Sequence, residues 1–256
     1  MRIYIAENPI SLGKTAATAA ARVINRAIDE KGKARIILST GKSQFETLSA
    51  LVAESVDWSK VEMFHLDEYV GLPESHIASF RKYLKERFIS KVRLEAYHLV
   101  CGDESLDSIS LALKSDDVDL GLIGIGENGH IAFNDPPCDF FSDSAYISVT
   151  LNEECRNQQV REGWFDSPSE VPEKAVSMTP RMIMRCRSII SAVPYSVKAP
   201  AIRDTLESRL VTNMVPATLL KTHPDFSLYL DKDSAGLIDT DKITALDGKP
   251  IYLSYI

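Results

Sequence analysis

Residues 34–38 read Ala-Arg-Ile-Ile-Leu, and the polar loop Ser39-Thr40-Gly41-Lys42-Ser43 follows them directly. A short apolar run bounded by a loop of this kind predicts a strand that is buried on both faces. After the loop, Phe45, Leu48 and Leu51 recur with helical spacing. The stretch therefore predicts one strand–loop–helix unit.

The same alternation continues along most of the chain. Further strands are expected at residues 2–6, 61–66, 118–125, 145–151, 188–193, 227–230 and 251–255. Further helices are expected at residues 11–30, 76–90, 106–114, 153–164 and 197–208, with a short one capped by Thr179. This order predicts an α/β fold with three α/β/α layers and a mostly parallel, doubly wound, Rossmann-like sheet. No linker divides the sequence, so residues 1–256 are expected to form a single domain.

Composition narrows the class of protein. The chain has 256 residues, 45% hydrophobic and 25% charged, as in an ordinary globular protein, and a net charge of −7. No basic cluster or long apolar run is present, so we expect neither a nucleic-acid partner nor a membrane partner. The first residues do not resemble a signal peptide, and the four cysteines form no CxxC pair. Reduced thiols and a cytoplasmic location are therefore expected.

Ligands of such sheets bind beyond the carboxyl ends of the strands. This rule selects four loops, at residues 39–43, 67–72, 124–137 and 194–198. In the first, backbone N–H groups at a helix start and the hydroxyls of Ser39, Thr40 and Ser43 can cradle an anion. Gly41-Lys42-Ser43 is not part of a P-loop, because Ile36 stands where that motif needs glycine. The loop is either a phosphate site or a tight turn with a helix cap.

Two adjacent carboxylates, Asp67 and Glu68, open the second loop. At a strand end, one of them can point into a cleft where burial adjusts its pKa for general-base catalysis. The alternative is a structural role as a turn or helix cap.

The third loop contains Gly124-Ile125-Gly126-Glu127-Asn128-Gly129, which matches GxGxxG. Dinucleotide binding is disfavoured, because the motif lies mid-chain and Pro136-Pro137 prevents a long helix after it. The loop instead presents His130 beside Asn128 and Asp135, and a nearby carboxylate orients an imidazole. A structural histidine is the alternative.

The fourth loop places Lys198 in the first turn of a helix, where a cation is unfavourable unless an anion lies near. Lys198 is therefore a candidate phosphate ligand, or else a solvated surface lysine. Arg161 can supply a second cation. No cluster of metal ligands is recognisable, so we expect neither a metal nor a cofactor.

Two segments, Leu66-Asp67-Glu68-Tyr69-Val70-Gly71-Leu72 and residues 126–136, resemble the glucosamine-6-phosphate deaminase (isomerase) family. The similarity runs from about Ile37 to Asp231. The wider superfamily, which includes 6-phosphogluconolactonases, has a similar glycine-rich loop but lacks the first segment. The resemblance implies that an amino-sugar 6-phosphate and water become a ketose 6-phosphate and ammonia, without metal or organic cofactor. The small-molecule sugar phosphate would be the partner, and the protein a monomer or homo-oligomer.

The resemblance also implies roles for individual residues. Asp67 matches the base that moves a proton between C2 and C1, and His130 matches the group that assists ring opening. Asp135 matches the acid that partners the histidine, and Asn128 a further member of the relay. Substrate or phosphate contacts are expected from Ser39, Thr40, Gly41, Lys42, Ser43, Glu68, Gly126, Gly129, Arg161 and Lys198.

Four departures from the family pattern surround this site. Asn128 stands where many members have Asp, Asp135 where Glu is usual, Lys42 where a second glycine is usual, and Pro194-Tyr195 where Gly-Ser is usual. They leave open whether the substrate is glucosamine or galactosamine 6-phosphate. The second candidate function is a sugar-phosphate lactone hydrolase, which needs His130 but not Asp67, and the third is a non-enzymatic sugar-phosphate sensor. No convincing allosteric site is recognisable, so allosteric regulation is not predicted.

Overall fold

A computed structural model describes residues 1–102, 106–246 and 250–256. Its main sheet has eight strands in the order β11-β1-β10-β9-β6-β2-β3-β5, and every neighbouring pair is parallel. The strands are β1 (Arg2–Ala6), β2 (Ala34–Leu38), β3 (Val61–His65), β5 (Ala96–His98), β6 (Leu120–Leu122), β9 (Ser188–Val193), β10 (Phe226–Asp231) and β11 (Tyr252–Tyr255). The first and last strands of the chain are neighbours, so one sheet joins its two ends.

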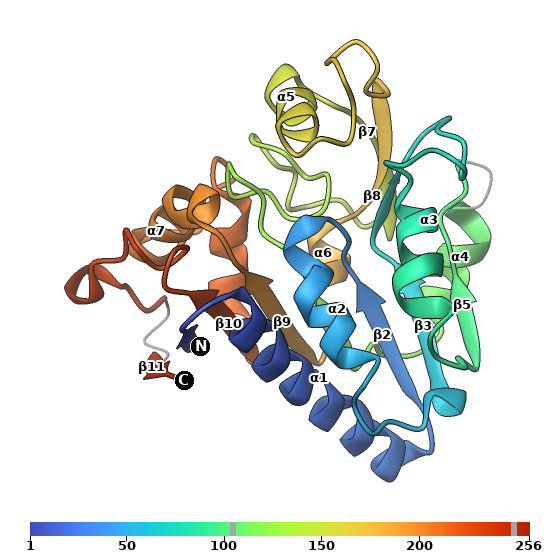
Figure 1. The fold of residues 1–256 in the computed structure, drawn as a ribbon, viewed down its shortest axis with the longest axis horizontal. Coiled ribbons are helices and arrows are strands. Elements are labelled where there is room, and N and C mark those ends of the chain that lie inside the picture. Colours follow the sequence, from blue (N-terminus) through green and yellow to red (C-terminus); the bar gives the residue numbers. More distant parts are fainter. Residues whose placement is uncertain (103–105, 247–249) are drawn as a thin grey trace.

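Helices cover both faces of this sheet, as the sequence predicts (Figure 1). The helices of the chain are α1 (Pro9–Lys31), α2 (Phe45–Leu51), α3 (Phe80–Leu84), α4 (Leu106–Lys114), α5 (Glu153–Arg161), α6 (Pro180–Ile183) and α7 (Ala199–Glu207), and all but α5 lie along the main sheet. Strand β2 shows the double burial: Ile37 packs with α4, α6 and α7, whereas Ile36 and Leu38 pack with α1 and α2. The predicted three-layer α/β/α architecture is confirmed. None of the described helices is long and apolar enough to cross a membrane.

The longest helix, α1, shows how local sequence sets the ends of an element. Asn8 caps it by accepting a hydrogen bond from the Ser11 N–H at 3.0 Å, and Pro9 occupies its first turn. Gly32 ends it at φ 79°, a conformation that costs glycine little. The helix is thus slightly longer than the predicted 11–30.

A second, three-stranded antiparallel sheet differs from the prediction. It consists of β4 (Asp67–Tyr69), β8 (Lys174–Met178) and β7 (Tyr146–Thr150), with β8 in the middle. The sequence pattern predicts residues 145–151 as part of the main sheet and residues 67–72 as a loop, and it does not reveal β5 or β8. Strand β7 alternates between shielded and exposed positions, which is typical of an antiparallel strand with one wet face. In Figure 1 the small sheet stands with α5 at the top of the molecule.

The predicted helix at residues 76–90 also begins later than expected. Ser79 caps α3, and a π-helical turn at Lys85–Ile89 completes the segment. The buried carboxylate of Glu68 accepts hydrogen bonds from the N–H groups of Phe80 and Arg81, so it holds the first turn of α3 against β4. This long-range contact sets the start of the helix, and the local spacing of apolar residues does not reveal it.

Candidate active site

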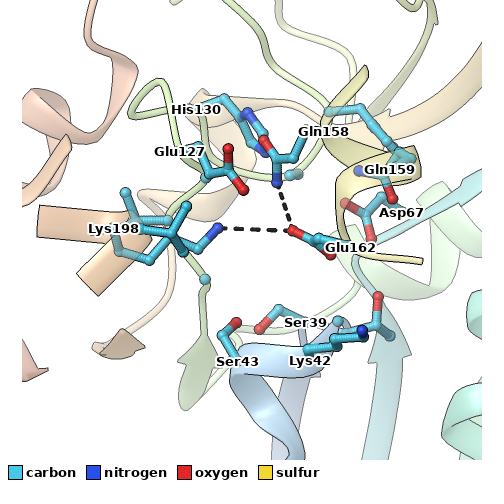
Figure 2. Close-up of a pocket in the computed structure, with 18 of the residues that line it drawn as sticks. Ser39, Lys42, Ser43, Asp67, Glu127, His130, Gln158, Gln159, Glu162 and Lys198 are labelled. Atoms are coloured by element: carbon cyan, nitrogen blue, oxygen red, sulfur yellow. Dashed lines mark hydrogen bonds and ion pairs between the residues drawn. The ribbon is translucent and has the colours of Figure 1, made fainter. Parts of the chain in front are cut away.

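A cavity of about 370 Å³ lies beyond the carboxyl ends of β2, β6 and β9. All four loops selected from the sequence contribute to its wall, and α5 adds further side chains (Figure 2). The predicted residues that line it are Ser39, Thr40, Gly41, Lys42, Ser43, Asp67, Gly126, His130, Arg161 and Lys198. Asn128 and Asp135 lie behind His130, while Glu68 and Gly129 are outside the wall. The fold therefore brings most of the predicted residues to one place.

The loop after β2 forms one end of the cavity. Gly41 has φ 99°, a conformation that side chains rarely adopt, and a 3-10 turn at Lys42–Gln44 begins next to it. The Tyr83 hydroxyl donates to the Gly41 carbonyl at 3.0 Å and holds the turn in place. The Ser39 hydroxyl is buried at the cavity wall and has no partner among the described residues. This turn therefore offers hydrogen-bond donors to an anion.

Lys198 faces this turn from the loop after β9. The residue is 6% exposed, and its Nζ lies 3.9 Å from Glu162 Oε1. Burial lowers the pKa of the Lys198 ammonium; the nearby carboxylates of Glu162 and Glu127 oppose this effect, and Arg161 adds to it. A buried cation with only a distant counter-ion suits a phosphate.

Asp231 stabilises the turn that carries Lys198. Tyr195 has φ 82° and donates its N–H to both oxygens of Asp231, at 3.2 and 3.1 Å. The Lys198 N–H in turn donates to the Tyr195 carbonyl at 3.0 Å. Asp231 thus stabilises the positive-φ backbone that Tyr195 adopts.

Arg161 is the second predicted cation. It projects from the last turn of α5, where about half of its side chain is exposed. Its Nη2 lies 2.7 Å from Glu127 Oε2, and both residues line the cavity. An anion bound between Arg161 and Lys198 would compete with two carboxylates, those of Glu127 and Glu162.

Asp67 is a buried carboxylate on the opposite side of the cavity. It is 6% exposed, and its Oδ1 has no hydrogen-bond partner among the described residues. Burial raises its pKa well above the ordinary value, and the negative charge of Glu68 raises it further. A carboxylate that has an oxygen free of hydrogen bonds from the described residues and a raised proton affinity is suited to act as a general base.

Glu68 points the other way, because successive side chains of a strand face opposite sides. It is fully buried and accepts hydrogen bonds from Ser79 Oγ at 3.0 Å and from the Arg81 guanidinium at 3.2 Å. The structure thus corrects the expected substrate contact for Glu68. Its carboxylate caps α3 and fixes β4, which positions Asp67.

His130, Asn128 and Asp135 form a hydrogen-bonded relay. Asn128 Nδ2 donates to Asp135 Oδ1 at 3.1 Å, so the Asn128 oxygen is left to face the imidazole. His130 Nδ1 lies 2.6 Å from this oxygen and 3.1 Å from Asp135 Oδ1. Because both oxygens can only accept, Nδ1 carries a proton, and no described residue forms a hydrogen bond with Nε2.

The protonation state of Asp135 follows from its surroundings. Burial acts to raise its pKa, but the hydrogen bond and positive charge of His130, together with Asn128, outweigh burial and hold the pKa below the ordinary value. Asp135 is therefore a carboxylate near neutral pH and stabilises a protonated His130.

The two glycines of this loop have steric roles. A Cβ on Gly126 would collide with the His130 ring. Gly129 has φ 80°, and a Cβ there would lie 2.7 Å from Val215 Cγ1. Gly126 therefore allows the ring to reach the cavity, whereas Gly129, expected to contact substrate, shapes the loop from outside the wall.

Helix α5 supplies cavity residues that the sequence interpretation missed. Gln158 Nε2 donates to Glu162 Oε1 at 2.8 Å, and Trp164 Nε1 donates to Glu162 Oε2 at 3.0 Å. Gln159 also lines the cavity. The available signal was the helical spacing of Gln158, Arg161 and Glu162, which places the three on one face. In the part of the chain that the structure describes, no three His, Cys, Asp or Glu side chains are grouped to hold a metal ion.

A base, an oriented imidazole and an anion pocket at the carboxyl edge of a parallel sheet define an enzyme of the three-layer α/β class that acts on a small anionic substrate. Residues 7–228 match the family of glucosamine-6-phosphate isomerases and 6-phosphogluconolactonases. The chain belongs to this family.

Individual relatives agree with this assignment. A glucosamine-6-phosphate deaminase from Halothermothrix orenii is 36% identical over 93% of this chain and 100% of its own length. A solved monomeric glucosamine-6-phosphate deaminase superposes with a TM-score of 0.83 and 29% identity, over 93% of this chain and 100% of its own. A 6-phosphogluconolactonase from Shewanella baltica superposes with a TM-score of 0.71 at 19% identity, over 90% of this chain and 98% of its own, which shows the common fold.

Proposed function

We propose that this protein converts glucosamine 6-phosphate and water into fructose 6-phosphate and ammonia. The observation that carries the proposal is the buried carboxylate of Asp67, whose Oδ1 has no hydrogen-bond partner among the described residues and which lines the same cavity as His130. Lactone hydrolysis moves no carbon-bound proton and has no need of such a base. Relatives that are named glucosamine-6-phosphate deaminases also support the proposal.

Phosphate binding orients the substrate. The phosphate is held by Lys198, by the turn from Ser39 to Ser43 and by Arg161, all of which line one side of the cavity. Phosphate then replaces the carboxylates of Glu162 and Glu127 as the counter-ion of the two cations. The sugar chain extends from there toward Asp67 and His130.

His130 opens the pyranose ring. Nε2 of His130 accepts the proton of the anomeric hydroxyl and passes it to the ring oxygen as the bond between that oxygen and C1 breaks. The carboxylate of Asp135 stabilises the transient imidazolium, with Asn128 holding the tautomer. The product of this step is the open-chain aldehyde.

Asp67 then performs the isomerisation. It takes the proton from C2, the electron pair forms the C1–C2 double bond, and the carbonyl electrons move to O1. The 2-ammonium group passes a proton to O1, and Asp67 returns its own proton to C1, which gives the 2-iminium form of the ketose. Water adds to C2 and ammonia leaves, so atoms and charge balance.

The direct test is ammonia release by the purified protein. Glucosamine 6-phosphate is compared with its 4-epimer, galactosamine 6-phosphate, and lactone hydrolysis is followed with 6-phosphogluconolactone. Ammonia from glucosamine 6-phosphate, with deuterium from heavy water at C1 of the product, supports the proposal. Faster turnover of the epimer reassigns the substrate, lactone hydrolysis alone reassigns the reaction, and sugar-phosphate binding without turnover indicates a sensor.

We further propose that residues 1–256 act as one cytoplasmic unit, as a monomer or a homo-oligomer. Cys138, Cys155 and Cys186 are buried thiols outside disulfides, which supports a reducing compartment. The similar deaminase of known structure is described as monomeric. Light scattering of the purified protein distinguishes the two oligomeric states.

A further inference from the structure

Gln159 presents a carboxamide group whose two ends have different surroundings. The residue is 6% exposed, and its Oε1 accepts a hydrogen bond of 2.7 Å from the Tyr69 hydroxyl. No described residue accepts a hydrogen bond from its Nε2, and the side chain lines the cavity. The amide therefore has its carbonyl end tied to the protein and its donor end available to a ligand.

Tyr69 holds this orientation rigidly. Its ring is 2% exposed and contacts the rings of Phe80, Phe133 and Phe165, with centroid distances of 5.1, 5.1 and 5.6 Å. A ring enclosed in this way has little freedom to move. The hydroxyl that it offers to Gln159 is therefore a fixed point.

The same strand carries the hydroxyl and the base. Asp67 and Tyr69 are two residues apart on β4, so their side chains leave the same face of the strand. Tyr69 reaches to α5 through its hydroxyl, and Asp67 and Gln159 both line the cavity, where Figure 2 draws them in the same part of the wall. The hydrogen bond thus fixes an amide donor in the cavity wall that also holds the Asp67 carboxylate.

We propose that Gln159 is a catalytic residue whose Nε2–H donates a hydrogen bond to O1 of the open-chain substrate while Asp67 removes the C2 proton. This inference rests on the proposed function. When the C2–H bond breaks, the carbonyl electrons move to O1, so the negative charge develops on this oxygen. A fixed donor at such an oxygen stabilises the transition state more than the ground state. Tyr69 is then a positioning residue.

The neighbouring Gln158 does not have this geometry. Its Nε2 already donates to Glu162 Oε1 at 2.8 Å. Its amide is therefore occupied by the protein. The difference between these two adjacent glutamines assigns the role to Gln159.

The test compares Gln159→Leu and Gln159→Glu with wild type. Both remove the donor, and Glu keeps the shape and can still accept from Tyr69. Loss of one such donor is expected to lower kcat about 10²–10³-fold. KM and competitive inhibition by inorganic phosphate are expected to stay near wild type, because the phosphate side of the cavity is untouched.

A matched control and a second variant keep the test decisive. Asn157→Asp makes the same amide-to-carboxylate change on α5 outside the cavity wall and is expected to keep the wild-type kcat. Tyr69→Phe removes only the hydroxyl that orients Gln159, and a fall of about 10-fold in kcat at unchanged KM is expected. Thermal unfolding of each variant establishes that it is folded.

The outcomes separate the two proposals. If wild type releases no ammonia, the proposed function fails, whatever the variants do. If wild type is active and a folded Gln159→Leu or Gln159→Glu variant retains its kcat, the role of Gln159 is refuted. If Gln159→Leu and Gln159→Glu both fail to fold, the Tyr69→Phe variant decides. A wild-type kcat in that variant refutes the role of Gln159, and a lower kcat at unchanged KM supports it.

Discussion

Replacement of Asp67 by Asn is expected to abolish most of the activity and to stabilise the fold. Asn has nearly the same shape but cannot take the proton from C2. Removal of a general base costs about 10²–10⁴-fold in rate. We expect a loss in the upper part of this range, because Glu68 cannot replace Asp67 as the base. The Glu68 carboxylate faces away from the cavity and accepts a hydrogen bond from Arg81.

The stabilisation follows from the surroundings of the carboxylate. Burial first, and then Glu68, raise the pKa of Asp67 in the folded protein, whereas an unfolded Asp has a pKa of about 3.9. At pH values between the unfolded-state pKa and the raised folded-state pKa of Asp67, the folded protein binds more protons than the unfolded chain. The free energy of unfolding therefore falls as pH rises through this range. Asn is neutral at every pH, so the variant does not lose stability by burying a charge at this position. The variant should therefore melt at a higher temperature than wild type near neutral pH, and the difference should shrink toward pH 4.

Three measurements check this prediction: ammonia release, deuterium incorporation at C1, and thermal unfolding at several pH values between 4 and 8. Inorganic phosphate binding serves as the control that the cavity is intact. A variant that keeps more than about a tenth of wild-type kcat would refute the role of Asp67 as the base. A variant that is less stable than wild type near neutral pH would refute the account of its burial.

Three further changes test other parts of the site. Lys198→Met removes a charge-assisted contact worth roughly 1.5–3 kcal/mol, so KM and the inhibition constant of inorganic phosphate should both rise by about 10–100-fold. If both constants stay unchanged, Lys198 has only a structural role. Asp135→Asn removes the negative charge beside His130 that would stabilise an imidazolium, and it should lower kcat. An unchanged kcat would leave Asp135 as a loop cap only. Gly126→Ala should lower kcat because the added methyl group collides with the His130 ring, and full activity would show that the ring has another route into the cavity.

Asp67 and Glu68 illustrate how neighbours in sequence acquire opposite roles. As a pair of adjacent carboxylates they are equivalent candidates for a base or a cap. The short strand β4 sends one into the cavity and the other into the body of the protein, where it meets Ser79 and Arg81. Among the residues that the structure describes, Asp67 Oδ1 has no hydrogen-bond partner, whereas both carboxylate oxygens of Glu68 accept hydrogen bonds.

The sequence alone locates most strands of the main sheet and the polar segments that follow their carboxyl ends. Strands such as Ala34–Leu38 and Ser188–Val193 are short apolar runs with clear ends, because burial on both faces demands apolar residues throughout. The loops after them carry glycine, hydroxyl and charged residues. The turn at Ser39–Ser43 and the adjacent carboxylates Asp67 and Glu68 could therefore be located from local pattern, and the His130 loop from its glycines.

Only the tertiary structure decides the small sheet, the role of Glu68 and the contribution of α5. Strand β4 has three residues, too few for a periodic signal, and it exists because β8 pairs with it from more than a hundred residues away in sequence. In the sequence, Gln159 looks like an ordinary polar residue of a polar helix. Only the fold reveals that it lines the cavity and that the Tyr69 hydroxyl binds its carbonyl oxygen. Long-range pairing and burial leave little trace in local sequence, because they depend on which distant residues the fold brings together.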